Sequence, residues 1–299
     1  MGTPEFAVQS LKILVDHHFQ IVAVVTAPDK PSGRGLQLHP SPVKQFALEN
    51  NIPVLQPDKL KSPEFIKQLK SYNADLQIVV AFRMLPEIVW NMPRLGTINL
   101  HASLLPDYRG AAPINWAIIN GEKETGITTF FLKHEIDTGD MLLQEKIAIE
   151  ENDTAGTLHD KLMIRGAELI LKTAEMVADG NYSPIPQSSS SNKTAPKIFK
   201  ENCLINWDQD VEMIRNFIRG LSPYPAAYTF LDNKLLKIFD VAVEQTKLNI
   251  NPGSVLSDNK TYLKFAAQNG FVLINDLQLE GKKRMPVKEF LKGNQIKTT

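Results

Sequence analysis

The chain has 299 residues, of which 43% are hydrophobic and 22% are charged, and its 33 basic residues balance its 33 acidic ones. This length exceeds what one hydrophobic core usually serves, so we expect two globular domains rather than a disordered or fibrous chain. A net charge of zero argues against a surface built throughout to coat nucleic acid. From Lys197 onward, however, 15 Lys and Arg stand against 11 Asp and Glu, so the C-terminal third carries a basic surplus.

The single cysteine, Cys203, excludes an intramolecular disulfide framework and a Cys-based zinc cluster, and it suits a reducing compartment. The longest apolar runs, such as residues 78–82, fall far short of the roughly 18 residues that a membrane span needs. No signal-peptide pattern opens the sequence, and no metal-ligand spacing occurs in it. We therefore expect a monomeric protein of the cytoplasm that needs no metal.

Helices and short apolar strands alternate along the first hundred residues. The patterns predict helices over residues 3–17, 41–49, 64–70 and 86–90, and strands over residues 21–25, 54–55, 76–82 and 97–101. In the first helix we expect Thr3 at the N-cap and Pro4 at the first helical position. Alternation of this kind predicts a doubly wound, Rossmann-like parallel α/β sheet, in which ligands bind beyond the carboxyl ends of the strands.

Residues 184–196, PIPQSSSSNKTAP, have no apolar period and are predicted to form a linker. The part that follows contains one helical stretch, 211–221, and short alternating segments at 237–239, 261–265 and 271–274. Asn, Asp, Gly and Pro separate these segments, which is typical of a small β-rich barrel or sandwich. The predicted domains are thus residues 1–183 and 197–299.

Two hydrogen-bonding side chains stand at the end of the strand at 97–101. Because side chains alternate along a strand, Asn99 and His101 project to one face. An amide can donate to a developing oxyanion, a histidine can carry a proton near neutral pH, and a carboxylate such as Asp137 in HEIDTGD can hold the imidazole charged. This set suits acyl transfer without a covalent enzyme intermediate. The alternative is that Asn99 and His101 bond local backbone and that Asp137 belongs to an ordinary turn.

Other catalytic patterns are missing from the sequence. It has no serine in a nucleophile-elbow motif, no evident reactive cysteine, and no glycine-rich dinucleotide fingerprint, which disfavours a dehydrogenase. Residues 99–144, NLHASLLPDYRGAAPINWAIINGEKETGITTFFLKHEIDTGDMLLQ, instead resemble the central motif of the folate-dependent formyltransferases. MGTPEFAV, APDKPSGRG, PSPVK, LSPYPAAYT and GKKRM resemble the members that formylate methionyl initiator tRNA, so the resemblance covers essentially the whole chain.

The resemblance implies a Rossmann-like catalytic domain over residues 1–183, followed by an OB-like barrel over residues 197–299 that binds tRNA. It also implies that Asn99, His101 and Asp137 are catalytic. The α-amine of methionyl initiator tRNA would then attack the formyl carbon of 10-formyltetrahydrofolate. The residues implied in folate binding are Ser103, Leu104, Leu105 and Pro106, together with Arg83, Met84 and Leu85, whose backbone would meet the pterin. Many relatives carry Gly-Gln where this chain has Phe82-Arg83, so a surface arginine remains the alternative for Arg83.

Two basic regions are candidates for tRNA binding. The polar loop between Thr26 and Ser41 contains Lys30 and Arg34, and the resemblance implies that it enters the acceptor end of the tRNA. The second region is the run Lys282, Lys283 and Arg284, which the resemblance makes a phosphate-binding patch. Without the resemblance, a disordered connector and a solvated charged face would be the simpler interpretations.

Two rival functions stay open at this point. One is a folate-dependent formyltransferase that acts on glycinamide ribonucleotide or an amino sugar, and the other is an RNA-binding protein with an idle catalytic site. Relatives normally carry a short apolar strand before MGTPEF, and the first strand of a doubly wound sheet is central. We therefore expect two neighbouring strands with unpaired backbone groups and a protein of low stability.

Overall fold

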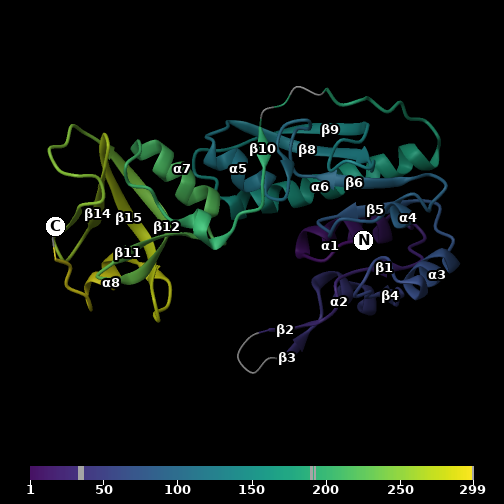
Figure 1. Ribbon diagram of the computed structural model, residues 1–299, viewed down its shortest axis with the longest axis horizontal. Helices are drawn as coiled ribbons and strands as arrows, with labels where there is room; N and C mark the ends of the chain where they lie inside the picture. Colours follow the sequence, from purple (N-terminus) through teal and green to yellow (C-terminus); the bar gives the residue numbers. More distant parts are fainter. Residues whose placement is uncertain (33–36, 189–190, 192, 298–299) are drawn as a thin grey trace. The chain divides into compact units, whose positions relative to one another are not determined.

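The computed structural model describes residues 1–32, 37–188, 191 and 193–297, which fall into two compact units (Figure 1). Unit 1 comprises Met1–Gly110, Thr125–Ile147 and His159–Thr194, and unit 2 comprises Ala111–Glu124, Ala148–Leu158 and Ala195–Thr299. Each unit is thus assembled from separate segments of the chain. Segment 111–124 belongs to unit 2 because α5 (Pro113–Ile119) packs on α7 (Val211–Leu221). There the Asn115 amide donates to the Gly220 carbonyl oxygen at 2.7 Å.

Unit 1 is an α/β structure. Its elements, in chain order, are α1 (Glu5–Asp16), β1 (Val24–Val25), β2 (Lys30–Ser32), β3 (Gln37–His39), α2 (Pro42–Glu49), β4 (Val54–Leu55), α3 (Pro63–Ser71), β5 (Gln77–Val80), α4 (Glu87–Trp90), β6 (Thr97–His101) and β7 (Arg109–Gly110), with most of β8 (Glu124–Phe131), β9 (Met141–Ala148) and α6 (Ala155–Ala178). Strands β1 and β4 pair in parallel, as do β5 and β6, and β8 runs antiparallel to β6. The predicted α/β fold class is confirmed.

Helix starts follow local capping rules. The Ser41 hydroxyl accepts from the Lys44 amide at the start of α2, and the Ser62 hydroxyl accepts from the Phe65 amide at the start of α3. In both helices a proline occupies the first turn, where its missing N–H costs no hydrogen bond. The predicted start of α1 was wrong by one residue, because Pro4 is still extended and serves as the N-cap, so the helix begins at Glu5.

Helices cover both faces of the unit 1 strands. On one face α3 and α4 pack on Val25, Leu55 and Val79, and on the other face α6 packs on Ile98 and Leu142. Side chains alternate between the two faces along a strand. Val79 of β5 is aligned with Asn99 of β6, the residue after Ile98, so Val79 and Ile98 point to opposite faces. A doubly wound arrangement therefore leaves the carboxyl ends of β5 and β6 open for a ligand.

The strands of unit 1 are interrupted between β1 and β5. Among the described residues, only Met1 and Gly2 lie there: the Gly2 amide donates to the Val25 carbonyl oxygen at 3.0 Å, and Gly2 forms an isolated parallel bridge with Val80. A Cβ on Gly2 would come within 2.8 Å of the Val80 carbonyl oxygen, so this close approach requires glycine. A cavity of about 520 Å³ lies along the same gap. The predicted strand at 21–25 is correspondingly reduced to β1, since residues 21–23 line the cavity.

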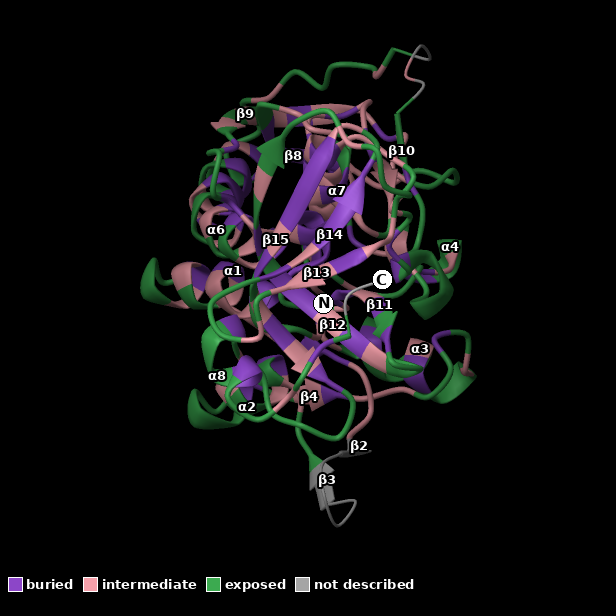
Figure 2. Ribbon diagram, turned by 90° about the vertical axis from the view of Figure 1, so that its left-hand side faces the viewer, coloured by how far each residue is buried: buried purple, intermediate pink, exposed green. Residues whose placement is uncertain are grey.

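Unit 2 is built on an antiparallel sheet. Its elements include α5, η1 (Lys200–Cys203), α7, β11 (Ala227–Leu231), β12 (Lys234–Gln245), β13 (Val255–Ser257), β14 (Leu263–Ala267), β15 (Gly270–Leu279), β16 (Met285–Pro286) and α8 (Val287–Leu291), and β10 (Thr194–Ala195) crosses from unit 1. The strand order is β11-β12-β15-β14-β13, with β16 beside β15. Figure 2 shows β14 and β15 largely buried, whereas β12 mixes buried, intermediate and exposed residues. The predicted barrel is thus a curled sheet with open edges, over which α7 contributes Ile214 and Ile218 to the core.

Candidate active site

Strand β6 carries Asn99 and His101 to the face on which α3 and α4 pack, as the alternation of the sequence predicts. Their neighbours Ile98 and Leu100 are buried on the opposite face, and Asn99 is aligned with Val79 of β5. The strand ends at His101, so both polar side chains lie at its carboxyl end. This is the edge at which a doubly wound sheet binds its ligands.

His101 is buried, and both of its ring nitrogens face oxygen atoms. Nε2 lies 2.8 Å from the Tyr108 carbonyl oxygen. A carbonyl oxygen can only accept, so Nε2 carries a hydrogen and donates it. Nδ1 lies 3.8 Å from Oδ2 of Asp137. The imidazole is therefore fixed in orientation and presents Nδ1 to the carboxylate.

Asp137 lies in the loop between β8 and β9, with a backbone φ of 55°. Its side chain is 16% exposed, and Oδ2 accepts a hydrogen bond from the Gly110 amide at 2.9 Å. The glycine of the DTGD motif has a steric role, because a Cβ at Gly139 would lie 1.6 Å from the Phe131 carbonyl oxygen. The loop can therefore close tightly against β8 and hold the carboxylate beside His101.

Gln187 is a positioning residue that sequence reasoning missed. Its Nε2 donates to the carbonyl oxygens of Asp137 at 2.9 Å and Gly139 at 2.8 Å, and its Oε1 accepts from the Arg109 guanidinium at 2.6 Å. Gln187 lies within the segment predicted to be a linker. No local pattern marks it, because its partners are about 50 and 78 residues away in the sequence.

The Asn99 side chain differs from that of His101 in having no fixed partner. Within the described part of the chain it forms no hydrogen bond, and it is half-buried. Buried and half-buried amides are normally hydrogen-bonded. An amide free of protein partners beside a buried histidine is available to a substrate oxygen.

The segment after β6 is held by hydroxyl and amide groups from the neighbouring strands. The Ser103 hydroxyl donates to the Asp107 carbonyl oxygen at 2.6 Å, and the Thr128 hydroxyl donates to the Ser103 carbonyl oxygen at 2.7 Å. Gln144 donates to the Leu105 carbonyl oxygen at 3.0 Å. Ser103 and Leu105 are buried, whereas Leu104 and Pro106 are partly exposed. Thr128 and Gln144 are further positioning residues that the sequence did not reveal.

The segment after β5 contains Arg83, Met84 and Leu85. The Arg83 guanidinium donates to the carbonyl oxygens of Pro57 and Asp58, so this side chain holds the loop that follows β4. Met84 is 68% exposed, and Leu85 is buried in the core beneath it. Because β5 and β6 are parallel neighbours, the segments 83–85 and 103–106 leave the sheet at the same edge.

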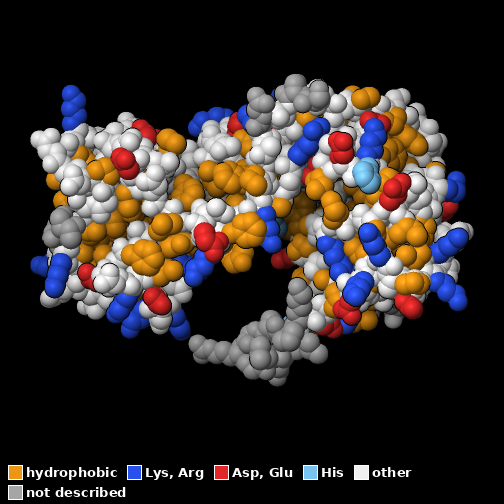
Figure 3. All heavy atoms as spheres, viewed as in Figure 1, with side chains coloured by type: hydrophobic (Ala, Val, Ile, Leu, Met, Phe, Trp, Pro, Cys, Tyr) orange, Lys and Arg blue, Asp and Glu red, His pale blue; other side chains and the backbone are white. Residues whose placement is uncertain are grey.

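The residues predicted to contact tRNA have unequal surroundings. Arg34 lies outside the described residues, and Lys30 belongs to β2. The Arg284 guanidinium already has partners within unit 2: it lies 2.6 Å from Asp276 and 4.2 Å from the centre of the Phe239 ring. Lys282 and Lys283 are exposed in the turn between β15 and β16. In Figure 3, Lys and Arg side chains are seen over the C-terminal part of unit 2, which Figure 1 colours yellow.

Neither a membrane span nor a metal centre is found in the described ranges. None of the helices there is long and apolar enough to cross a bilayer. No group of three or more His, Cys, Asp or Glu side chains in these residues is arranged to hold a metal ion.

The sequence places this site within a known class of enzymes. Residues 1–173 match the family described as Formyl transferase, and residues 197–295 match the one described as Formyl transferase, C-terminal domain. The chain belongs to the formyl transferase family. Curated relatives named methionyl-tRNA formyltransferase include a Bacteroides fragilis protein, 54% identical over 98% of this chain and 93% of its own length. A Phocaeicola vulgatus relative of the same name is 55% identical over 98% and 94%.

Solved structures share the fold at much lower identity. The sugar 3N-formyl transferase WlaRD, described in the presence of dTDP and 5-N-formyl-THF, superimposes with a TM-score of 0.68. The match covers 94% of this chain and 97% of WlaRD, at 22% sequence identity. At this identity the comparison establishes the fold, with a Rossmann-like domain followed by a smaller C-terminal domain.

Proposed function

We propose that this chain transfers the formyl group of 10-formyltetrahydrofolate to the α-amine of methionine carried by initiator tRNA. The observation that carries the proposal is the identity of about 54%, over nearly the full length of both chains, to relatives named for this reaction. Asn99, His101 and Asp137, at the carboxyl edge of the unit 1 sheet, supply the groups that such a transfer needs.

The reaction is a nucleophilic acyl substitution. The lone pair of the α-amine forms a bond to the formyl carbon, and the carbonyl π pair moves onto oxygen to give a tetrahedral oxyanion. The oxyanion then re-forms the carbonyl as the bond from carbon to N10 breaks. The amine loses one proton and the departing N10 gains one, so neither an oxidant nor a metal is required.

Asn99 and His101 are proposed to hold the oxyanion. The Asn99 amide has N–H donors without a partner among the described residues, so it can donate to the negative oxygen. Since Nε2–H of His101 is committed to the Tyr108 carbonyl, the second donor has to be Nδ1–H of the imidazolium. Two donors aimed at one oxygen stabilise the transition state more than the uncharged formyl group.

Asp137 is proposed to keep His101 charged and to relay the proton. Oδ2 of Asp137 lies 3.8 Å from Nδ1 of His101, so the carboxylate faces the ring nitrogen that would carry the second proton. The Gly110 amide and the clamp formed by Gln187 fix the position of this carboxylate. Asp137 can then assist, directly or through water, the movement of the proton from the attacking amine to N10.

The folate would bind at the edge formed by the segments 83–85 and 103–106. The carbonyl oxygens of Ser103 and Leu105 are already occupied by Thr128 and Gln144, which makes that segment a rigid wall. Met84 contributes exposed apolar surface against which a pterin ring can pack. The Arg83 side chain is proposed to act indirectly, since its donors are spent on the backbone at residues 57 and 58.

For the tRNA, the loop that contains Lys30 and Arg34 is proposed to meet the acceptor end. Lys282 and Lys283 are proposed to contact the phosphate backbone. Arg284 would contribute less, because Asp276 already neutralises its charge. We further propose that the protein acts as a monomer in the cytoplasm, where initiator tRNA is charged and used.

The test is transfer of labelled formyl from 10-formyltetrahydrofolate to methionyl initiator tRNA, with glycinamide ribonucleotide and an amino-sugar nucleotide as competing acceptors. Label in the tRNA alone would support the proposal. Label in either small acceptor instead would identify the rival formyltransferase. Tight tRNA binding without formyl transfer or folate binding would identify an RNA-binding protein with an idle site.

A further inference from the structure

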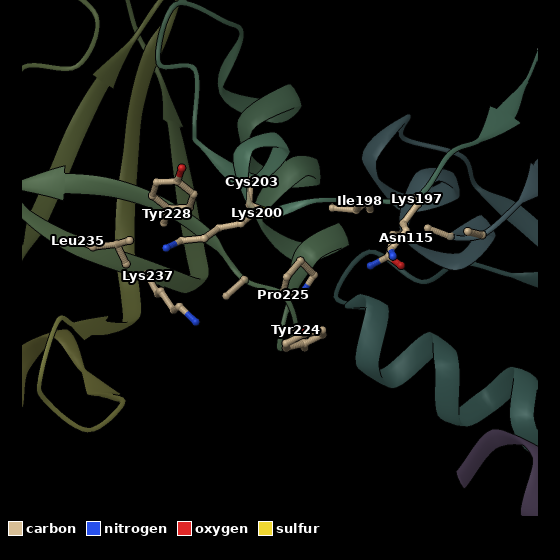
Figure 4. Close-up of a pocket in the computed structure, with 13 residues that line it drawn as sticks. Asn115, Lys197, Ile198, Lys200, Cys203, Tyr224, Pro225, Tyr228, Leu235 and Lys237 are labelled. Atoms are coloured by element: carbon tan, nitrogen blue, oxygen red, sulfur yellow. The ribbon is translucent and has the colours of Figure 1, made fainter. Parts of the chain in front are cut away.

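Two features outside the catalytic groups are candidates for a further role. One is a pocket of about 400 Å³ in unit 2, whose walls include Lys197, Lys200 and Lys237 (Figure 4). Its basic lining fits the tRNA binding that the resemblance implies for this part of the chain, so it adds no new role. The other is the segment 107–110 of unit 1, together with the residues that hold it.

The segment 107–110 gives one hydrogen-bonding partner to each of two proposed catalytic side chains. The Tyr108 carbonyl oxygen accepts from Nε2 of His101 at 2.8 Å. Two residues further on, the Gly110 amide donates to Oδ2 of Asp137 at 2.9 Å. A shift of this segment would therefore move the partners of the imidazole and of the carboxylate together.

The backbone of this segment is not in a conformation that it prefers by itself. Tyr108 has a φ of 59°, in the left-handed region that bulky residues rarely adopt. Its side chain is nevertheless buried, with an exposed fraction of 4%. A residue keeps such a conformation only where the contacts around it fix the backbone. The contacts that fix Tyr108 are therefore part of how the site is built.

Several of these contacts come from residues 191–193, which lie more than eighty positions later in unit 1. The Tyr108 amide donates to the Lys193 carbonyl oxygen at 2.8 Å. The Ser191 hydroxyl donates to Oδ1 of Asp107 at 2.5 Å, and the Lys193 ammonium lies 3.8 Å from Oδ2 of the same carboxylate. Both oxygens of the Asp107 carboxylate thus face this one short stretch of chain.

The exposure of the ion pair shows what kind of effect it can have. The side chains of Lys193 and Asp107 are 46% and 41% exposed. An ion pair this exposed contributes little to the free energy of unfolding, so its removal should hardly change stability. It can still fix geometry, because it joins a hydroxyl bond and a backbone bond that end on two consecutive residues, Asp107 and Tyr108.

We propose that Asp107 is a positioning residue through which Ser191 and Lys193 hold the segment that orients the imidazole. Residues 191–193 then support the active site, although the sequence predicted a linker there. The inference rests on the proposed function, because it takes the imidazole and its neighbouring carboxylate as the groups that act in the reaction. It adds a second support to the clamp formed by Gln187, which acts on other partners.

The first measurement is formylation by the full chain, with KM determined separately for folate and for tRNA. Asp107→Ala should lower kcat about tenfold and leave both KM values within about twofold, because the imidazole is misplaced while the substrates still bind. Lys193→Met should lower kcat less, and Lys193→Arg should keep most of it, since a guanidinium also pairs with a carboxylate. Asp16→Ala removes the carboxylate of another exposed ion pair, in α1, and should change nothing.

Two further variants test whether the contacts act through one carboxylate. Asp107→Asn keeps an oxygen for the Ser191 hydroxyl but loses the charge, so its kcat should match that of Lys193→Met. Asp107→Ala combined with Lys193→Met should cost no more than Asp107→Ala alone, because the lysine then has no carboxylate left to hold. These variants keep the proposal testable if Asp107→Ala folds poorly.

Hydrogen exchange gives a readout that needs no formyl transfer. In Asp107→Ala the amides of Tyr108 and Gly110 should exchange at least about tenfold faster than in the unmodified chain, because the segment opens more often. The melting temperature should stay nearly the same, as expected for the loss of an exposed ion pair. Asp16→Ala should leave the exchange of both amides unchanged.

Four results would each overturn this role. They are a normal kcat in Asp107→Ala, unchanged amide exchange in that variant, losses that add in the double variant, and a loss in Lys193→Met confined to KM for tRNA, which would make this lysine a tRNA contact. The proposed function is judged separately, from formyl transfer by the unmodified chain. If that transfer fails while amide exchange rises as expected in Asp107→Ala, the function is wrong and the support of the segment stands.

Discussion

At the scale of single residues, Asn99 and His101 are placed by the same strand but held in different ways. His101 is committed through Nε2 to the Tyr108 carbonyl, whereas the Asn99 amide has no partner among the described residues. A group without structural bonds can be removed with little effect on folding. Asn99 is therefore the better residue for separating chemistry from structure.

Asn99→Ala should retain folate affinity and lower kcat by about 10² to 10³, because one oxyanion donor is lost. Single-turnover formylation, with folate affinity measured by fluorescence, would check both parts. Asn181→Ala changes an exposed asparagine in unit 1 and serves as the matched control. Near-normal turnover in Asn99→Ala would remove Asn99 from the proposed mechanism.

Gln187→Glu should lower kcat about tenfold while leaving the melting temperature nearly unchanged. The carboxylate can still accept from Arg109, but it has no hydrogen for the carbonyl oxygens of Asp137 and Gly139, so the loop around Asp137 loosens. Because His101 is proposed to depend on that carboxylate, the pH profile of kcat should also move. Gln45→Glu, on the exposed side of α2, should change neither quantity. A normal rate and profile in Gln187→Glu would limit Gln187 to a structural role.

At the scale of elements, local patterns located the helices and strands well where the chain supplies its own stop signals. Ser41 and Ser62 begin α2 and α3 as serine caps do, and β6 ends at His101 as predicted. The strand expected at 21–25 is shorter. It pairs with β4 on one side, but on the other side Gly2 gives it a single hydrogen bond, to the Val25 carbonyl oxygen. The periodicity of apolar residues shows which side chains prefer burial. Whether a segment pairs as a strand depends on backbone that is distant in the sequence.

The turn between β15 and β16 carries the second element-scale prediction. Lys282→Glu with Lys283→Glu should weaken tRNA binding across sequences and flatten its salt dependence, because two phosphate contacts become repulsive. Folate affinity should stay unchanged. Lys61→Glu with Lys67→Glu makes the same charge change near α3 and should cost far less. Equal tRNA affinity in all of these proteins would mean that the turn is only a solvated face.

At the scale of the whole molecule, we expect the gap between β1 and β5 to limit the stability of the fold. In a protein that begins at Met1, the terminal amine lies inside the interrupted sheet, 2.6 Å from the Ile78 carbonyl oxygen. Burial lowers the pKa of this amine from 8.0 to about 5. Between these values the unfolded chain binds more protons than the folded one, so stability rises with pH across that window and is lost as pH falls from 8 to 5. The slope is at most about 1.4 kcal/mol per pH unit.

Urea unfolding at pH 5 to 8 would measure this slope. An extension of about five apolar β-branched residues before Met1 should fill the cavity, raise the melting temperature and abolish the contribution of the buried amine, because the amine moves out of the sheet. An extension of Gly and Ser residues would move the amine without supplying apolar surface. If the two extended proteins melt at the same temperature as the unextended one, the gap does not limit stability.

The sequence by itself determined the alternation of helices and strands, the common face of Asn99 and His101, and the membership in the formyl transferase family, because these depend on residue type and short spacing. Only the tertiary structure decided that Gln187 clamps the loop of Asp137, that Arg83 holds the backbone at Pro57, and that three lysines from two segments line one pocket. Such contacts join residues tens of positions apart. Their geometry depends on how the chain folds back on itself, which local periodicity does not encode.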